Sequence, residues 1–263
     1  MKTKSMLVGA DLFRLPDWHS VRLAEDVAMV DILSKGRVLF KAGAGGIFPP
    51  ISAGLGWDQR RYLSRSAETM QIIKKCWTAE VFDWEGKHYH LKGVRAMPKP
   101  VQKPHPPIFM PARNPRAMER NAREGYGANQ GAGRWTLEQT DPGWWRQWHK
   151  EWEAALARHD RTAQECPVSV FFNLFCTNDP ERAWATYRDG ILHVTHAYAM
   201  LSEQPLLPET PDQMVRFLRD ILEGAAPDHL LLWDTKPGMT YEDAYAFHKL
   251  FAEEVWPQIK DLT

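Results

Sequence analysis

Short apolar runs alternate with longer segments of helical periodicity along most of this chain. The apolar runs lie at residues 5–10, 38–42, 108–112, 127–130, 168–177 and 228–233. Each run is continuous in apolar character rather than alternating, which is typical of strands that are buried on both faces of a parallel sheet.

The segments between these runs carry apolar residues three and four positions apart, as one face of a helix does. Predicted helices span residues 17–34, 60–77, 115–124, 141–159, 180–201, 212–223 and 241–259. Asp17 is the expected N-cap of the first helix, and Gly36 lies where its C-cap belongs. Residues 81–91 predict a small hairpin that turns at Glu85 and Gly86.

Strands separated by helices indicate an α/β fold with a parallel sheet and helices outside it, and six strand–helix units can be counted. No shift in composition interrupts this alternation, so we expect one domain over residues 1–263. A doubly wound sheet and a (β/α) barrel both fit the pattern. In either fold, ligands bind at the carboxyl ends of the strands.

Composition narrows the function classes. The 263 residues carry a formal net charge of zero, with 44% hydrophobic and 25% charged residues, a balance that favours small-molecule chemistry over a nucleic-acid partner. No run of eighteen apolar residues and no signal peptide occurs, so we expect no membrane association and a cytoplasmic location. Three cysteines without a CxxC motif predict neither a disulfide framework nor a zinc site.

Gly43, Ala44 and Gly45 directly follow the second apolar run and look like a phosphate-binding turn. A dinucleotide fingerprint requires a helix immediately afterwards, and the Ile-Phe-Pro-Pro sequence at residues 47–50 cannot begin one. Small residues here would instead let a flat ring approach the backbone. The alternative is a tight turn that binds nothing.

A stiff connector precedes the third apolar run, because five prolines fall between Pro98 and Pro107. The run ends at Ala112, Arg113 and Asn114, directly before a helix that begins with proline. A helix N-terminus beside a guanidinium is a favourable anion site. The alternative is a surface arginine followed by a capping asparagine.

Other constellations are weaker. His88 and His90 share a strand face, and His193 and His196 are three apart on a helix, but no carboxylate or cysteine completes either set. We therefore expect no metal, and no catalytic residue is predicted. Four tryptophans at helical spacing, at positions 144, 145, 148 and 152, predict a helix that packs against a barrel or a partner subunit.

Three stretches together resemble the bacterial luciferase-like monooxygenase family: LAEDVAMVDILSKGRVLFKAGAGG, RSAETMQIIKKCWTAEVFDWEGKHYHLKGVRAMPKPVQKPHPPIFMPARNP and PDHLLLWDTKPGMTYEDAYAFHKLFAEEVWPQIK. Members are (β/α)8 TIM barrels that bind reduced FMN or, in some branches, the deazaflavin F420. Many oxidise small organic substrates with O2 and receive reduced flavin from a partner reductase. The resemblance implies such a barrel, incomplete at the N-terminus, because members have two further βα units before the strand at residues 6–10.

The resemblance also implies a site. The flavin phosphate would be held by Ala112, Arg113 and Asn114. The residues expected beside the ring and ribityl chain are Gly9, Ala10, Asp11, Gly43, Ala44 and Gly45. The family often has a non-prolyl cis peptide bond near the first of these sets, here at Gly9–Ala10 or Ala10–Asp11. The candidates for the substrate side are Trp57, Asn129 and Gln130.

This chain differs from other members of the family at two positions of the implied flavin site. Some members have an arginine where this chain has Ala44, so phosphate binding would depend more on Arg113. A histidine on the family's second strand has no counterpart here. Arg61 and Glu68 match a recurring spacing in the family, which we interpret as support for a helix and a loop.

The resulting prediction is a flavin-dependent monooxygenase or oxidoreductase that acts on a small, partly apolar organic substrate. It would use O2 and externally supplied reduced FMN, with a flavin reductase as a partner, and would form a homo-oligomer. One alternative is a truncated, non-catalytic protein that binds flavin or another subunit. The other alternative is an F420-dependent hydride-transfer oxidoreductase.

Overall fold

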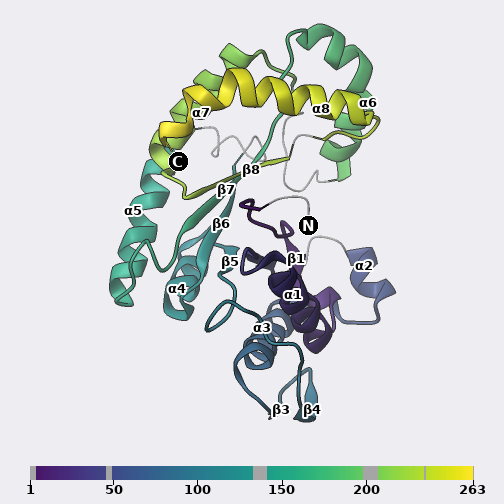
Figure 1. Cartoon of the computed structure of the whole chain (residues 1–263), viewed down its shortest axis with the longest axis vertical. Coiled ribbons are helices and arrows are strands. Elements are labelled where there is room, and N and C mark those ends of the chain that lie inside the picture. The colour runs from purple at the N-terminus through teal and green to yellow at the C-terminus, as the bar shows by residue number, and fades with distance from the viewer. Residues whose placement is uncertain (1–3, 46–48, 133–140, 198–206, 234, 263) are drawn as a thin grey trace. The chain divides into compact units, whose positions relative to one another are not determined.

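The computed structural model describes residues 4–45, 49–132, 141–197, 207–233 and 235–262 (Figure 1). Two compact units can be distinguished, Met1–Met110 and Pro111–Thr263. Each is described by itself, and the single domain expected from the sequence stays a prediction.

The first unit contains a parallel sheet in the order β1 (Phe13–Arg14), β2 (Phe40–Gly43) and the start of β5 (Ile108–Pro111). The strand predicted at residues 5–10 is not formed. Val8 forms only an isolated bridge, to Val38, and regular pairing begins at Phe13. Leu7 is 52% exposed, so the run lacks the two-sided burial that the prediction assumed.

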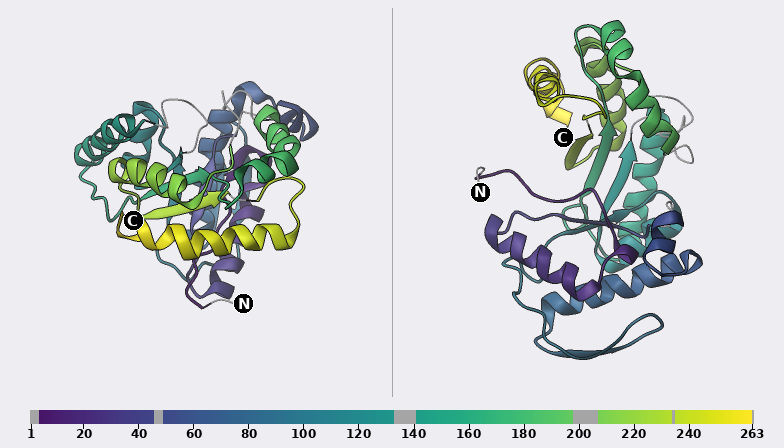
Figure 2. Two further views of the ribbon diagram at one scale, coloured as in Figure 1. Left: turned by 90° about the horizontal axis from the view of Figure 1, so that it is seen from above. Right: turned by 90° about the vertical axis from the view of Figure 1, so that its right-hand side faces the viewer.

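Two long helices of the first unit, α1 (Ser20–Ser34) and α3 (Tyr62–Thr78), lie side by side (Figure 2). The indole nitrogen of Trp77 donates a hydrogen bond to the Ala24 carbonyl at 2.9 Å and ties the pair together. The N-cap of α1 is His19 rather than Asp17, because Asp17 belongs to a separate 3-10 turn, Leu15–Asp17. Short helical segments at Pro49–Gly54 (α2) and Gln59–Arg61 were not predicted as separate elements.

The predicted hairpin is confirmed as β3 (Phe82–Glu85) and β4 (His90–Val94), which pair antiparallel. Glu68 of α3 anchors it, because its carboxylate accepts hydrogen bonds from the Trp84 indole and from the His88 and Tyr89 amides, each at 2.9 Å. A Cβ on Gly86 would lie 2.0 Å from the Glu68 carboxylate. The supporting role expected for Glu68 is therefore confirmed.

The proline-rich connector is fixed by a buried carboxylate. Asp31 of α1 accepts hydrogen bonds from the Gln102 backbone amide at 3.0 Å and from its side-chain amide at 2.7 Å. The same side-chain nitrogen donates to the Val38 carbonyl at 2.9 Å. At the end of the connector, the Pro107 carbonyl accepts from the Phe40 amide at 2.8 Å. Asp31 thus holds the connector against α1, while Gln102 and Pro107 join the connector to Val38 and Phe40.

The second unit contains a parallel sheet in the order β6 (Gly127–Ala132), β7 (Val168–Asn173) and β8 (His229–Trp233). Its helices are α4 (Pro115–Glu124), α5 (Pro142–Arg158), α6 (Pro180–Ala197), α7 (Pro211–Ala225) and α8 (Tyr241–Leu250). A π turn at Phe251–Val255 and 3-10 turns at Trp256–Gln258 and Lys260–Leu262 follow α8. The part of the predicted helix beyond Ala197 lies outside the described residues.

The tryptophan-rich helix α5 packs inside its own unit. Trp145, Trp148 and Trp152 are all buried in the hydrophobic core of that unit. Helix α7 lies next to α5 (Figure 1), and its Phe217 meets Phe172 of β7 edge to face, with ring centroids 6.1 Å apart. The first of the two packing roles predicted for these tryptophans is therefore confirmed.

Parallel strands alternating with helices confirm the predicted α/β fold class. α4 spans the predicted residues, whereas β7 ends at Asn173 rather than at 177 and α8 ends at Leu250 rather than at 259. Among the helices that the structure describes, none combines the length and the apolar character needed to cross a membrane.

The two hydrogen bonds from Gln102 to the Asp31 carboxylate form what we call the connector clamp. Removal of this carboxylate tests the contribution of the clamp to stability. We expect Asp31→Ala to lower the free energy of unfolding by about 2 to 4 kcal/mol, because two partly buried donors of Gln102 lose their acceptor. Urea unfolding of the two proteins measures this difference. Asp26→Ala, on the exposed side of the same helix, is the matched control and should change the stability by about 0.5 kcal/mol or less. Equal effects of the two substitutions would contradict the clamp.

Candidate functional site

The start of α4 has the features of an anion site. Asn114 is the N-cap, and its side-chain oxygen accepts a hydrogen bond from the Ala117 amide at 3.0 Å. Pro115 occupies the first helical position, and the first turn contains no acidic residue. Arg113 and Arg116 are exposed on either side of the cap. Two guanidinium groups therefore lie at the positive end of the helix dipole, although the capping role considered for Asn114 is also confirmed.

The backbone that leads into this helix is held by two side chains of the same unit. The Pro111 carbonyl accepts a hydrogen bond from the Arg120 guanidinium at 3.0 Å, and burial lowers the pKa of Arg120. The Ala112 carbonyl accepts one from the Trp148 indole at 2.9 Å. Both carbonyls belong to the strand end, so Arg113 projects from a fixed backbone rather than from a free loop.

The glycine-rich turn after β2 is shaped by its own chain. A Cβ on Gly43 would lie 2.7 Å from the Leu12 side chain, and Gly45 has a φ of 69°, in the left-handed region. The Ala44 carbonyl accepts a hydrogen bond from the Ser66 hydroxyl at 2.9 Å. These contacts account for the small residues as a tight turn, and their expected role beside a flavin stays a prediction.

The residues at the end of the first apolar run are exposed, as Gly9, Ala10 and Asp11 all are. A Cβ on Gly9 would lie 2.5 Å from the Leu39 carbonyl oxygen, so only glycine permits this close approach to the β2 segment. A non-prolyl cis peptide bond is present, as the resemblance implied, but it joins Asp11 to Leu12, one residue beyond the expected bonds.

A buried lysine was missed by the sequence analysis. Lys41 of β2 is 2% exposed, and its ammonium nitrogen lies 5.4 Å from the ring centroid of Phe109. Burial lowers the pKa of Lys41 to about 8, and the opposing effect of the Asp11 carboxylate is smaller. A lysine inside the apolar run VLFKA is the pattern that could have revealed it.

Asn129 and Gln130 are both buried on β6, but adjacent strand residues point to opposite faces. Gln130 pairs in register with Val170, on the face of β7 from which Phe172 contacts α7. Asn129 pairs with Ser169, on the face opposite the helices. We therefore expect that Asn129 can contact a ligand on the face of the sheet opposite the helices. The Gln130 side chain lies on the helix face.

Trp57 is half-buried, and its indole nitrogen is buried without a hydrogen-bond acceptor among the described residues. The chain before Trp57 and the chain after Gln130 lie partly outside the described residues, at 46–48 and 133–140. The predicted ring-side residues belong to the first unit, whereas Ala112, Arg113 and Asn114 belong to the second.

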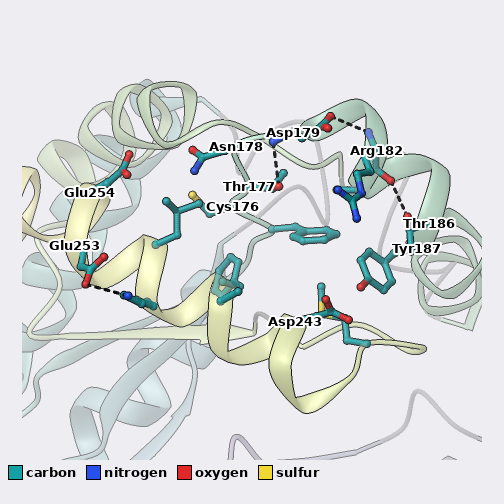
Figure 3. Close-up of a pocket in the computed structure, with 17 residues that line it drawn as sticks. Cys176, Thr177, Asn178, Asp179, Arg182, Thr186, Tyr187, Asp243, Glu253 and Glu254 are labelled. Atoms are coloured by element: carbon teal, nitrogen blue, oxygen red, sulfur yellow. Dashed lines mark hydrogen bonds and ion pairs between the residues drawn. The ribbon is translucent and has the colours of Figure 1, made fainter.

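A pocket of about 570 Å³ lies in the second unit between α6 and α8, and no predicted site residue lines it. Figure 3 shows Arg182 and Tyr187 on α6 near Asp243 on α8, with Glu253 and Glu254 toward the other end. A hydrogen bond between Tyr187 and Asp243 raises the pKa of the phenol and lowers that of the carboxyl. The charges of this pocket are of both signs and partly pair with one another, so they favour no single class of ligand.

The first histidine pair has ordinary partners. His88 lies 2.8 Å from the Ser64 hydroxyl, and the His90 ring is hydrogen-bonded to the Glu85 carboxylate. The pKa of His88 is lowered, mainly by burial. In the described part of the chain, no group of three His, Cys, Asp or Glu side chains is placed to hold a metal ion.

The sequence model of the family described as "Luciferase-like monooxygenase" matches residues 1–229. The oxygenase component of flavin-dependent trigonelline monooxygenase from Acinetobacter baylyi is 31% identical over 119 residues, which are 45% of this chain and 33% of that protein. The match thus spans about a third of the length of this curated relative.

Solved structures share the fold over nearly the whole chain. Monooxygenase RslO1 from Streptomyces bottropensis has a TM-score of 0.81 at 20% identity, covering 97% of this chain and 79% of that chain. An F420-dependent secondary alcohol dehydrogenase scores 0.73 at 14% identity, covering 98% and 81%. The FMN complex of the oxygenating constituent of 3,6-diketocamphane monooxygenase from Pseudomonas putida scores 0.72 at 15% identity, covering 97% and 80%. These likenesses confirm the predicted barrel type of fold.

The buried lysine predicts a pH dependence of stability. The folded chain releases the Lys41 proton near pH 8, whereas the unfolded chain keeps it to about 10.5, so the unfolded state binds more protons between these values. We therefore expect the stability of the wild type, relative to Lys41→Met, to be constant below pH 8 and to rise by about 2 to 3 kcal/mol toward pH 10.5. Urea unfolding of both proteins at pH 7, 9 and 10 measures this, and a pH-independent difference would contradict it.

Proposed function

Because the chain belongs to the luciferase-like monooxygenase family, we propose that it is a flavin-dependent monooxygenase acting on a small, partly apolar organic substrate. It would use O2 and reduced FMN that a separate reductase supplies. The observation that carries this proposal is the pair of exposed arginines at the acid-free N-terminus of α4, which suits the phosphate of a flavin nucleotide.

The hydrogen-bond donors at the start of α4 support the binding of a phosphate. The Asn114 oxygen is used by the cap, and Pro115 has no amide hydrogen, so the Arg116 amide remains at the first turn together with the Asn114 side-chain nitrogen. Arg113 adds a planar guanidinium that can bind two phosphate oxygens at once. With Ala44 in place of an arginine, these groups would carry most of the phosphate binding.

The proposal also includes the residues predicted to contact the rest of the flavin and the substrate. Gly9, Ala10 and Asp11, with the turn at Gly43–Gly45, would lie beside the ring and ribityl chain. When bound, the flavin supplies the redox chemistry. The chain's own residues bind it, orient it and exclude water from the reacting centre. Trp57 and Asn129 would contact the substrate.

The name of the curated relative supports a two-component enzyme, because that protein is the oxygenase component of a flavin-dependent monooxygenase that acts on trigonelline. An oxygenase component implies a reductase that delivers reduced flavin. We extend to this chain the class of small organic substrate and the reductase partner, and we retain the expected homo-oligomer as a prediction.

An F420-dependent hydride-transfer oxidoreductase is the second candidate, because one fold neighbour is described as an F420-dependent secondary alcohol dehydrogenase. The absorbance of the bound cofactor distinguishes the two, since the deazaflavin and flavin bands differ. A non-catalytic flavin-binding protein would bind the cofactor but show no substrate-dependent O2 consumption.

The proposal is tested by titrating the purified chain with FMN, NADH and a flavin reductase, and then following O2 uptake with a panel of small aromatic and heterocyclic acids. We expect flavin to bind and at least one substrate to be hydroxylated or cleaved at the expense of O2. Failure to bind either FMN or F420 at high micromolar concentration would overturn the proposal.

Arg113→Ala tests the phosphate site directly. We expect FMN binding to weaken about 10- to 100-fold, because a charge-assisted bidentate contact is lost. Riboflavin, which has no phosphate, should bind the variant and the wild type equally well. Arg123→Ala, at the other end of the same helix and also exposed, is the matched control. Equal losses for FMN and riboflavin would contradict a phosphate contact.

A further inference from the structure

Lys41 lies on the face of its sheet that points away from the helices. The preceding residue, Phe40, stacks on Phe13 with centroids 5.5 Å apart and meets Trp77 of α3 edge to face at 5.2 Å. Phe40 therefore faces the helix layer, and Lys41 faces the opposite side because strand side chains alternate. Its partner in register on β5 is Phe109, whose ring the ammonium approaches.

Two residues near Lys41, Gly43 and Asp11, are among those that the family resemblance implies beside the flavin ring and ribityl chain. Gly43 is two positions further along the same strand and so shares its face. The Leu12 side chain lies against Gly43 on that face. Asp11, next to Leu12, is close enough for its carboxylate to act on the Lys41 ammonium. The Lys41 ammonium thus lies near residues that the resemblance implies beside the flavin ring and ribityl chain.

Burial disfavours the charged form of Lys41. Lys41 is 2% exposed, whereas Asp11 is exposed, so the Asp11 carboxylate keeps its water while the ammonium loses most of its own. The effect of desolvation on the pKa of Lys41 exceeds the effect of Asp11. A buried ionisable group whose charged form is disfavoured is typical of a residue retained for function.

We propose that Lys41 is a positioning residue of the flavin site, whose ammonium favours the electron-rich reduced ring over the neutral oxidised ring. The inference rests on the proposed function, which places the ring beside Asp11 and Gly43. Reduced flavin carries additional electron density and becomes an anion on losing its N1 proton. A cation in a water-poor environment stabilises such a ring by Coulomb attraction, whereas the oxidised ring carries no net charge to attract.

The proposed role of Lys41 implies that the protein binds reduced FMN more tightly than oxidised FMN. An oxygenase that receives flavin already reduced benefits if it binds the reduced form more tightly than the oxidised form, because product flavin then leaves and reduced flavin enters. Lys41 would supply part of that difference. A lysine that only supported the fold would affect both affinities equally.

The test compares the dissociation constants of oxidised FMN and of anaerobically reduced FMN in four proteins: the wild type, Lys41→Met, Lys41→Arg and Lys92→Met. We expect Lys41→Met to weaken binding of reduced FMN about tenfold more than binding of oxidised FMN. This corresponds to a two-electron midpoint potential about 30 mV lower. Lys41→Arg keeps the charge and should retain most of the preference. Lys92 is exposed on β4 of the hairpin, so its substitution should change neither constant.

A second readout needs no flavin. The flavin-free Lys41→Met protein should unfold at a higher urea concentration than the wild type at pH 7.5, because the buried charge is gone. A lower urea midpoint, together with an unchanged ratio of the two FMN affinities, would show that Lys41 supports the fold and would overturn the inference.

The remaining outcomes are also distinct. If Lys41→Met binds both forms of FMN with the wild-type ratio, the role of Lys41 is refuted while flavin binding stands. If the wild type binds neither form, the proposed function fails and the inference fails with it. If Lys41→Met does not fold, Lys41→Gln, which keeps a polar group without the charge, gives the same comparison of affinities.

Discussion

Burial of parallel strands on both faces is the constraint on which the rest of this structure depends. The backbone N–H and C=O groups of these strands form hydrogen bonds to neighbouring strands in the plane of the sheet. Each side chain therefore faces either the helices or the opposite side of the sheet. On the helix face, Phe40 and Phe172 pack against Trp77 and Phe217. On the opposite face lies the buried polar residue Lys41. Lys41 and Asn129 thus place buried polar groups on that face, whereas Gln130 is buried on the helix face.

Side chains from helices and connectors fix those strand ends. The Asp31 carboxylate holds Gln102 of the connector, the Trp148 indole holds the Ala112 carbonyl, and the Arg120 guanidinium holds the Pro111 carbonyl. Irregular backbone needs such partners when it is buried. In the second unit, Trp148 and Arg120 thus fix the backbone that precedes Arg113.

The two units carry different parts of the proposed chemistry. The second unit presents positive charge at a helix N-terminus, which suits a phosphate. The first unit presents a glycine-bounded turn and one buried ammonium, which suits a flat, electron-rich ring. This division of tasks is typical of enzymes in which the cofactor performs the redox step and the protein supplies binding and electrostatics.

The sequence by itself determined the elements whose cause is local: the helix at 115–124 between an asparagine cap and a glycine, the hairpin, the tryptophan-rich helix and the family resemblance. Tertiary structure decided what depends on distant partners. It replaced the strand at residues 5–10 by a bridge at Val8, moved the first N-cap to His19, and separated Asn129 from Gln130 by face. It also buried Lys41 beside Phe109. Propensity and capping act over a few residues, whereas pairing, facing and burial arise only when segments far apart in the chain meet.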